Sequence, residues 1–293
     1  MKNIMTFDLE EWFHILDLPV GIRRLGQWPA PSRIEKIVPE LLEMLSELGV
    51  LATFFVLGQV GEKHPDIIKQ IAYLGHEVAS HGYSHELIYE VGPHRFREDI
   101  RRGKAIVEDL IGCQVIGYRG PGFSITLNNL WALDIIVEEG FRYDATLYPG
   151  IHAHGGIPGL PSAPFTLMTL DGHLLDEFPV SVFSLGKLRC AFSGGGYFRL
   201  FPFPVITQLI KSFNKRGKPV MFYIHPRDLD AETPRLPMPF SRRFKCYVNI
   251  SGAHGKLVKI LHRHAFCSVR EWRTNNTKHI STLSLTDLFK HAE

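Results

Sequence analysis

Two histidines in the stretch SHGYSH, His81 and His85, have a spacing that could hold a metal ion. They follow an apolar run that predicts a strand, and near the N-terminus Asp8 and Glu10 lie at the end of another. Imidazole and carboxylate ligands from separate segments suit Zn, Fe, Co, Ni or Mn better than Ca or Mg. A histidine pair of this kind is common by chance, however, and the alternative is a loop whose imidazoles bond to the backbone.

The two N-terminal carboxylates have a spacing that allows them to divide two tasks. Asp8 and Glu10 are two residues apart, so on an extended chain they face the same side, whereas Glu11 points away. One could hold a metal ion while the other takes a proton from water. The alternative is an acidic surface loop, which the neighbouring Phe7 and Trp12 argue against.

Alternating apolar runs and helical patterns predict the elements that must position these groups. They indicate a parallel barrel or a doubly wound sheet, because most strands are separated by a helix. Strands are expected at 3–8, 50–58, 76–80, 114–120, 141–146, 174–180 and 219–225, and helices at 32–49, 65–75, 94–111, 128–139, 204–215 and 255–264. Ser32 and Glu35 predict a capping box for the first helix, and Pro39 a kink or a later start.

Further polar groups follow the other predicted strands. Arg119, Pro121 and Gly122 come after the fourth strand, Asp144 lies at the fifth, and His225 follows the last. In a parallel barrel the carboxyl ends of the strands share one rim, so these groups should converge there with the carboxylates and the histidine pair. This convergence predicts a metal-dependent hydrolytic site, in which an open coordination position holds a water molecule.

Composition excludes several classes of protein. The 293 residues include 33 basic and 30 acidic side chains, a formal charge of +3 that is too small to indicate a nucleic-acid partner. The four cysteines are far apart and are expected to be reduced. No apolar run approaches the ~20 residues of a membrane span, and acidic residues interrupt the N-terminus where a signal peptide would be apolar. We therefore expect a cytoplasmic protein; the oligomeric state stays open.

Five motifs in order resemble those of the polysaccharide deacetylase family, also called the NodB-homology or carbohydrate esterase 4 family. They read TFDLEEW, SHGYSH, YRGPGFS, RYDATLYP and FYIHP. The resemblance implies a distorted (β/α)7 barrel over about residues 3–228, with a helical and strand extension at 229–293 and one domain over 1–293. The variants RGPGFS, GGGYFRLFP and YIHPRDLD are most similar to a subgroup associated with bacterial exopolysaccharide gene clusters.

The resemblance assigns roles to individual residues. Asp8 corresponds to the general base and His225 to the general acid, while His81 and His85 correspond to the metal-binding pair. The family's metal-binding carboxylate usually directly follows the base, where this chain has Leu9, so the resemblance places that role on Glu10, with Asp8 as the alternative.

Other matches are supporting residues. Arg119 corresponds to the arginine that holds the base, and Asp144 to an aspartate that orients the catalytic histidine. Gly122, after Pro121, corresponds to a backbone N–H donor for the oxyanion. Gly82 stands where the family usually has Ser or Thr, so support for the histidine loop should come from elsewhere, such as Ser84.

Aromatic residues beside the strand ends are candidates for the walls of a sugar subsite. They are Trp12, Phe13, Phe123 and Tyr148. The Gly-rich stretch SGGGYF is expected to form a tight loop by the cleft, in which Tyr197 or Phe198 could also stack on a sugar. The alternative for the first four is ordinary core, and for the Gly-rich stretch a plain turn.

The expected function is that of a metal-dependent hydrolase that removes N-acetyl groups from an amino sugar, in a polysaccharide or its precursor. The metal is expected to be Zn, with Co, Ni, Fe or Mn as alternatives. Two other functions stay open: a ureide or imide amidohydrolase of the same fold, similar to allantoinase-like relatives, and a catalytically inactive sugar-binding protein.

Overall fold

The computed structural model describes residues 1–16, 31–185, 188–276 and 280–285. Its main sheet contains seven successive neighbouring strands that are all parallel. In spatial order they are β10 (Met221–Ile224), β1 (Asn3–Leu9), β2 (Thr53–Val56), β3 (Glu77–Ser80), β4 (Gly117–Tyr118), β5 (Tyr143–Asp144) and β7 (Leu174–Glu177). These are the seven strands predicted from the sequence, so the α/β fold class is confirmed.

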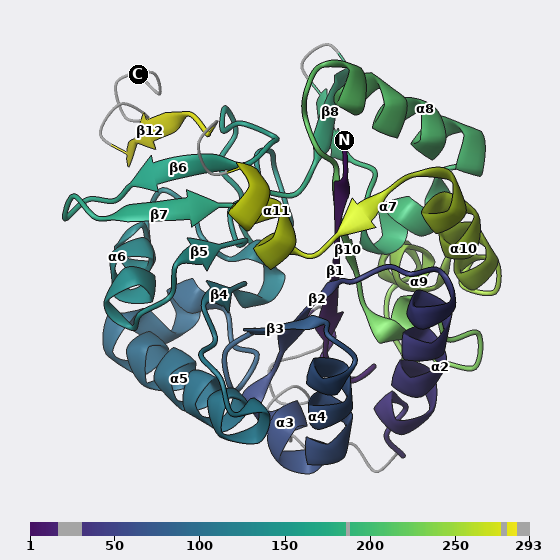
Figure 1. The fold of residues 1–293 in the computed structure, drawn as a ribbon, viewed down its shortest axis with the longest axis horizontal. Coiled ribbons are helices and arrows are strands. Elements are labelled where there is room, and N and C mark those ends of the chain that lie inside the picture. Colours follow the sequence, from purple (N-terminus) through teal and green to yellow (C-terminus); the bar gives the residue numbers. More distant parts are fainter. Residues whose placement is uncertain (17–30, 186–187, 277–279, 286–293) are drawn as a thin grey trace.

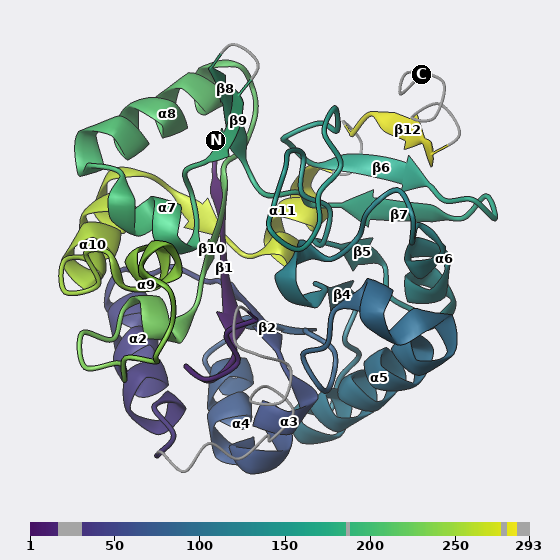
Figure 2. The same ribbon diagram turned by 180° about the vertical axis from the view of Figure 1, so that it is seen from behind.

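Helices cover the outside of the curved sheet, as Figures 1 and 2 show. Their apolar faces pack on strands that are buried on both sides, which explains why the strands read as nearly continuous apolar runs. The helices are α2 (Ile34–Glu47), α3 (Gly58–Lys63), α4 (Pro65–Tyr73), α5 (Ile88–Ile111), α6 (Trp131–Glu138) and α8 (Phe203–Lys215). Helix α5 is broken by non-helical Gly92, which accounts for the later helix start predicted from the sequence. None of the described helices is long and apolar enough to cross a bilayer.

The sheet continues past β7 in a way that the sequence did not predict. Strand β6 (Phe165–Met168) pairs antiparallel with β7, and β12 (Thr282–Ser284) pairs with β6. A separate hairpin joins β8 (Val182–Leu185) to β9 (Leu188–Ala191). Among the described residues no strand ladder connects β7 to β10, so the row of parallel strands is open at that side.

The C-terminal segment packs back on the row of parallel strands. It contains α9 (Phe240–Tyr247), α10 (Ala253–Arg263), β11 (Phe266–Cys267) and α11 (Val269–Asn276). Strand β11 adds to the N-terminal end of β1, and the Arg270 amide donates to Glu77 on β3 at 2.7 Å. The stretch FCSVREW within this segment is a two-residue strand followed by a helix.

Two local predictions were wrong. Ser32 does not cap α2: Arg33 is the N-cap residue, and the Ser32 hydroxyl donates to the buried Glu11 carboxylate instead. The Gly-rich stretch is not a loop but contains the short helix α7 (Gly195–Leu200). Its glycines allow close approach, because a Cβ on Gly194 would lie 2.1 Å from the Tyr223 ring and one on Gly196 would lie 2.7 Å from the Lys245 carbonyl.

Candidate active site

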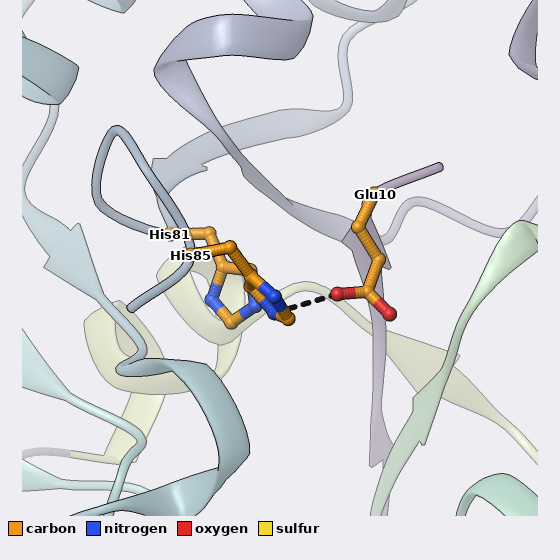
Figure 3. A group of neighbouring side chains, drawn as sticks. All are labelled: Glu10, His81 and His85. Carbon is orange, nitrogen blue, oxygen red and sulfur yellow. Dashed lines mark ion pairs between the residues drawn. The ribbon is translucent and has the colours of Figure 1, made fainter. Parts of the chain in front are cut away.

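The carboxyl ends of β1 and β3 bring one carboxylate and two imidazoles together. Glu10 follows β1, and His81 and His85 follow β3. One ligand atom from each of the three lies within 4.8 Å of the others, and His85 Nε2 is 2.7 Å from Glu10 Oε2. Figure 3 shows both imidazole rings turned toward the Glu10 carboxylate.

The loop between the two histidines is fixed by a carboxylate of α5. Asp99 accepts hydrogen bonds from the amides of Tyr83 and Ser84 at 2.8 and 2.9 Å, and from the Ser84 hydroxyl. Gly82 adopts φ +77°, and a Cβ there would lie 2.6 Å from Asp99 Oδ2. The predicted support by Ser84 is therefore present, but Asp99, which the sequence did not indicate, is the centre of it.

Three features of these residues fit a divalent cation. His81 Nδ1 lies 2.6 Å from the Arg119 carbonyl, which can only accept, so the neutral ring has its lone pair on Nε2. Burial lowers the pKa of His81 to about 4, which keeps the ring neutral, as a ligand must be. Glu10 Oε2 is buried yet receives no hydrogen bond of acceptable geometry, although His85 Nε2 is only 2.7 Å away.

Arg227 is a partner of Glu10 that the sequence analysis missed. Its Nη1 lies 2.6 Å from Glu10 Oε1, on the oxygen that faces away from the histidine pair. Burial alone would raise the pKa of Glu10, but the charges of Arg227, His85 and His225 lower it well below its ordinary value. Arg227 therefore keeps Glu10 ionised and leaves Oε2 as the oxygen available to a cation.

Asp8 is held by a fully buried guanidinium, as the resemblance implied. Arg119 Nη1 donates to Asp8 Oδ1 at 2.6 Å and to Thr6 Oγ1 at 2.8 Å. The guanidinium also lies 4.1 Å from the centre of the Phe55 ring. The second carboxylate oxygen, Asp8 Oδ2, is 3.9 Å from His225 Nε2. Asp8 thus has one oxygen fixed and one directed toward the predicted acid.

His225 lies beside Asp8 and Glu10, but its orienting carboxylate is not the predicted one. Its Nδ1 is 2.9 Å from Asp228 Oδ2, within the turn η2 (Pro226–Asp228), and its Nε2 is 3.5 Å from Glu10 Oε1. Burial and the Arg227 charge lower the pKa of His225, but Glu10 and Asp228 outweigh them and raise it overall. Asp228 is held in turn by Arg199 of α7, at 3.2 Å.

Asp144 does not contact His225, which corrects the role given to it by the resemblance. Its carboxylate accepts from the Thr146 amide and hydroxyl, at 3.0 and 2.5 Å, and Glu177 lies on the neighbouring strand β7. Asp144 and Glu177 are opposite each other in the β5–β7 register. Asp144 is a buried structural residue two strands away from the histidine pair on β3.

The predicted oxyanion donor lies in a tight turn. Pro121, Gly122 and Phe123 form a single helical turn directly after Arg119 and Gly120. Gly122 has φ +63°, and a Cβ there would lie 2.6 Å from the Leu16 side chain, so no other residue fits without displacement. Its role toward the oxyanion stays a prediction.

Three of the four predicted aromatic walls are core residues, while Phe13 is partly buried. Trp12, Phe123 and Tyr148 expose only 2%, 5% and 2% of their surface, so they offer no face to a sugar. Trp12 packs with Ile15, while Phe123 and Tyr148 pack on each other. Within the Gly-rich stretch Phe198 is fully buried, whereas Tyr197 is 37% exposed and is the accessible aromatic of the two.

Of the three residues that the sequence analysis missed, only Asp228 follows a recognisable local pattern. Asp228 is three residues after His225 with Pro226 between them, and a proline-initiated turn returns an aspartate at that position to the residue before the proline. Arg199 and Arg227 had no comparable signal, because their partners are determined by tertiary packing.

Two family models match this chain. Residues 28–135 match the model described as polysaccharide deacetylase, and residues 145–274 match a domain of unknown function (DUF3473). The second match crosses residue 228, where the sequence suggested the end of the barrel core.

Curated relatives are similar over part of their length. A peptidoglycan-N-acetylglucosamine deacetylase of Bacillus cereus is 36% identical over 100 residues, which cover 34% of this chain and 36% of the relative. A chitooligosaccharide deacetylase of Sinorhizobium fredii is 39% identical over 64 residues, 22% of this chain and 28% of the relative. This chain thus spans about a third of the length of such relatives.

Solved structures share the fold over almost the whole chain. A Mycobacterium smegmatis protein assigned to the polysaccharide deacetylases superimposes with a TM-score of 0.66 at 22% identity, covering 96% of this chain and 92% of that one. A peptidoglycan deacetylase of Bacillus subtilis superimposes with a TM-score of 0.50 at 14% identity, covering 94% and 93%.

Proposed function

Because residues 28–135 of this chain carry a polysaccharide deacetylase domain, we propose that the protein is a metal-dependent hydrolase that removes N-acetyl groups from an amino sugar. The observation that supports this most directly is the Glu10, His81 and His85 cluster, with Asp8 and His225 beside it. Two relatives, the peptidoglycan-N-acetylglucosamine deacetylase and the chitooligosaccharide deacetylase, support N-acetylglucosamine polymers as the substrate class. An exopolysaccharide or its precursor is the substrate that we favour, on the resemblance of YIHPRDLD and GGGYFRLFP.

A divalent cation on Glu10 Oε2 and the two imidazoles would polarise the acetyl carbonyl and acidify a water molecule. Two nitrogen ligands and one carboxylate oxygen suit Zn, which we favour, and also Co, Ni, Fe or Mn. The remaining chemistry rests on side chains of the chain itself.

Asp8 is the base that takes the proton of the attacking water. Arg119 binds Oδ1 at 2.6 Å, which leaves Oδ2 as the oxygen that can accept a proton. The water oxygen then bonds to the acetyl carbon, and the Gly122 amide donates a hydrogen bond to the carbonyl oxygen as negative charge develops there.

His225 is the acid that completes the reaction. Its imidazolium, oriented by Asp228 through Nδ1, donates the Nε2 proton to the sugar nitrogen as the C–N bond breaks. The products are acetate and the free amine. The raised pKa of His225 favours the protonated form that this step needs.

Three variants test the division of roles. Asp8→Asn and His225→Ala should each lower acetate release from an N-acetylglucosamine oligomer by ~10²–10⁴-fold while retaining bound metal. His81→Ala should lose both activity and metal, because a ligand is removed. Metal analysis of each purified variant, with acetate release measured before and after chelation, checks all three.

Other outcomes point to the alternatives. Acetate release that survives complete chelation would contradict the metal-dependent mechanism. Hydrolysis of a cyclic ureide but not of N-acetylated sugars would favour the amidohydrolase, and tight sugar binding without hydrolysis would favour an inactive sugar-binding protein.

A further inference from the structure

Helix α9 presents two aromatic side chains to solvent. Phe240 is 84% exposed and Phe244 is 49% exposed, although phenylalanine is usually buried. They are four residues apart on one helix and therefore lie on the same face. Exposed Pro237 and Pro239 directly precede them. This run forms an apolar ridge at the surface.

Basic residues flank the ridge on both sides. At about 100° per residue, Arg243 falls on one side of the line through Phe240 and Phe244, and Lys245 on the other. Both basic side chains are exposed, and only Tyr247 of this helix is buried. An aromatic centre with basic flanks is the pattern of helices that lie flat in the interface of an anionic bilayer. Acidic residues are absent from α9, so its charge is uniformly positive.

The ridge is attached directly to the candidate active site. Leu236, just before α9, packs against Trp12 and Ile15, which closely follow Glu10 on the same loop. Arg199 donates to the carbonyls of Lys245 and Cys246 at 3.0 and 2.8 Å while it holds Asp228. Figures 1 and 2 both show α9 beside α7 and near β10, the strand that His225 follows.

We propose that α9 docks the protein on an anionic membrane surface. Phe240 and Phe244 insert at the level of the lipid headgroups, and Arg243 and Lys245 contact the anionic groups around them. Together with the proposed function, this places the active site beside the membrane, so that the sugar substrate is one presented at a lipid surface. The net charge of +3 acts in the same direction as the local charge of α9.

Vesicle flotation with the full-length protein tests the docking. We expect binding to vesicles of equal parts phosphatidylglycerol and phosphatidylcholine, weak binding to phosphatidylcholine alone, and release by high salt. The double variant Phe240→Ser/Phe244→Ser should bind at least about tenfold more weakly. Arg243→Gln/Lys245→Gln should bind about 25-fold more weakly, since each of the two basic residues near such a surface contributes about fivefold.

Matched controls separate this proposal from the proposed function. Tyr73→Ser removes an aromatic that is 90% exposed on α4 and should leave vesicle binding unchanged. Acetate release from a soluble oligomer should be the same in the α9 variants and the wild type, because α9 supplies no catalytic group.

Two results would overturn the docking proposal and leave the deacetylase proposal standing. One is wild-type protein that does not float with anionic vesicles. The other is an α9 double variant that floats normally but binds a soluble N-acetylated oligomer more weakly, which would make the ridge a sugar-binding surface.

Discussion

Two regions of this molecule that contain buried carboxyl groups neutralise them in opposite ways. At the strand ends beside the histidine pair, each carboxylate has its own guanidinium: Asp8 has Arg119, Glu10 has Arg227 and Asp228 has Arg199, at 2.6, 2.6 and 3.2 Å. Between β5 and β7, the buried carboxyl groups of Asp144 and Glu177 lie opposite each other in the strand register. The first region therefore favours ionised carboxylates, and the second favours a protonated carboxyl group.

The pKa directions of the two regions follow from this difference. Burial opposes ionisation in both, but arginine charges lower the pKa of Glu10 and of Asp228. In the second region burial raises the pKa of Asp144 and of Glu177, and the neighbouring Asp144 charge raises that of Glu177 further. The partner of a buried carboxyl, rather than burial itself, therefore decides whether it can serve as a base or a metal ligand.

The first prediction removes Arg119, the arginine of the first region that pairs with Asp8. Arg119→Met should lower the free energy of unfolding by about 3–5 kcal/mol, because Asp8 is left buried without its partner, and should lower acetate release by ~10²–10⁴-fold. Urea unfolding and kinetics check both effects. Arg273→Met is the control, since the Arg273–Asp176 pair is partly exposed and should contribute less than about 1 kcal/mol. Equal small losses in both variants would contradict the comparison.

The second prediction asks which aspartate orients His225. Asp228→Asn should lower acetate release by about 10²-fold or more and lower the pKa of His225, because a charge that raises it is removed. The acid form of His225 is needed, so activity lost as pH rises should be lost at a lower pH in this variant. Asp144→Asn should leave that limb of the pH profile where it is. A shift caused by Asp144→Asn and not by Asp228→Asn would restore the role that the resemblance gave to Asp144.

The sequence predicts the residues at the strand ends but not the pairings between side chains that are distant along the chain. Strand ends could be placed from apolar runs, and with them Asp8, Glu10, His81, His85, Arg119 and His225, because parallel strands deliver their ends to one rim. The row of seven parallel strands follows from the same patterns.

Ion pairs between side chains on different elements could not be predicted in this way. Arg199 and Arg227 meet Asp228 and Glu10 only after α7 and the turn behind β10 are packed, and no local spacing encodes that. Trp12, Phe123 and Tyr148 lie beside strand ends as predicted, but residue type does not tell whether a ring faces a cleft or the core. Strand β12 was missed because its pairing with β6 is non-local, whereas β6 pairs with β7 in a short local hairpin that the sequence analysis did not identify.

The third prediction concerns the guanidinium on the candidate metal ligand. Arg227→Leu should weaken metal binding by about 10–100-fold, because Glu10 loses the partner that fixes Oε1 and favours the ionised form. Arg227→Lys should restore part of the affinity, since the charge returns without the planar guanidinium. Titration of metal-free protein with a chromophoric competing chelator measures this directly. Unchanged affinity in Arg227→Leu would show that Arg227 is not a positioning residue for the ligand.

The fourth prediction tests the second region alone and has the smallest expected effect. The pKa of Glu177 is raised above its ordinary value of 4.5 by burial and by Asp144, so the folded protein binds this proton more tightly than the unfolded chain. The stability from this group is complete below pH 4.5 and falls by up to about 1.4 kcal/mol per pH unit as the pH rises toward the raised pKa. Glu177→Gln keeps the shape of the protonated side chain and removes the titration, so the variant should match the wild type in acid and gain on it as pH rises. Urea unfolding from acidic to mildly alkaline pH measures this difference. A difference that stays constant with pH would mean that Glu177 does not hold the proton, and the contrast between the two regions would fail.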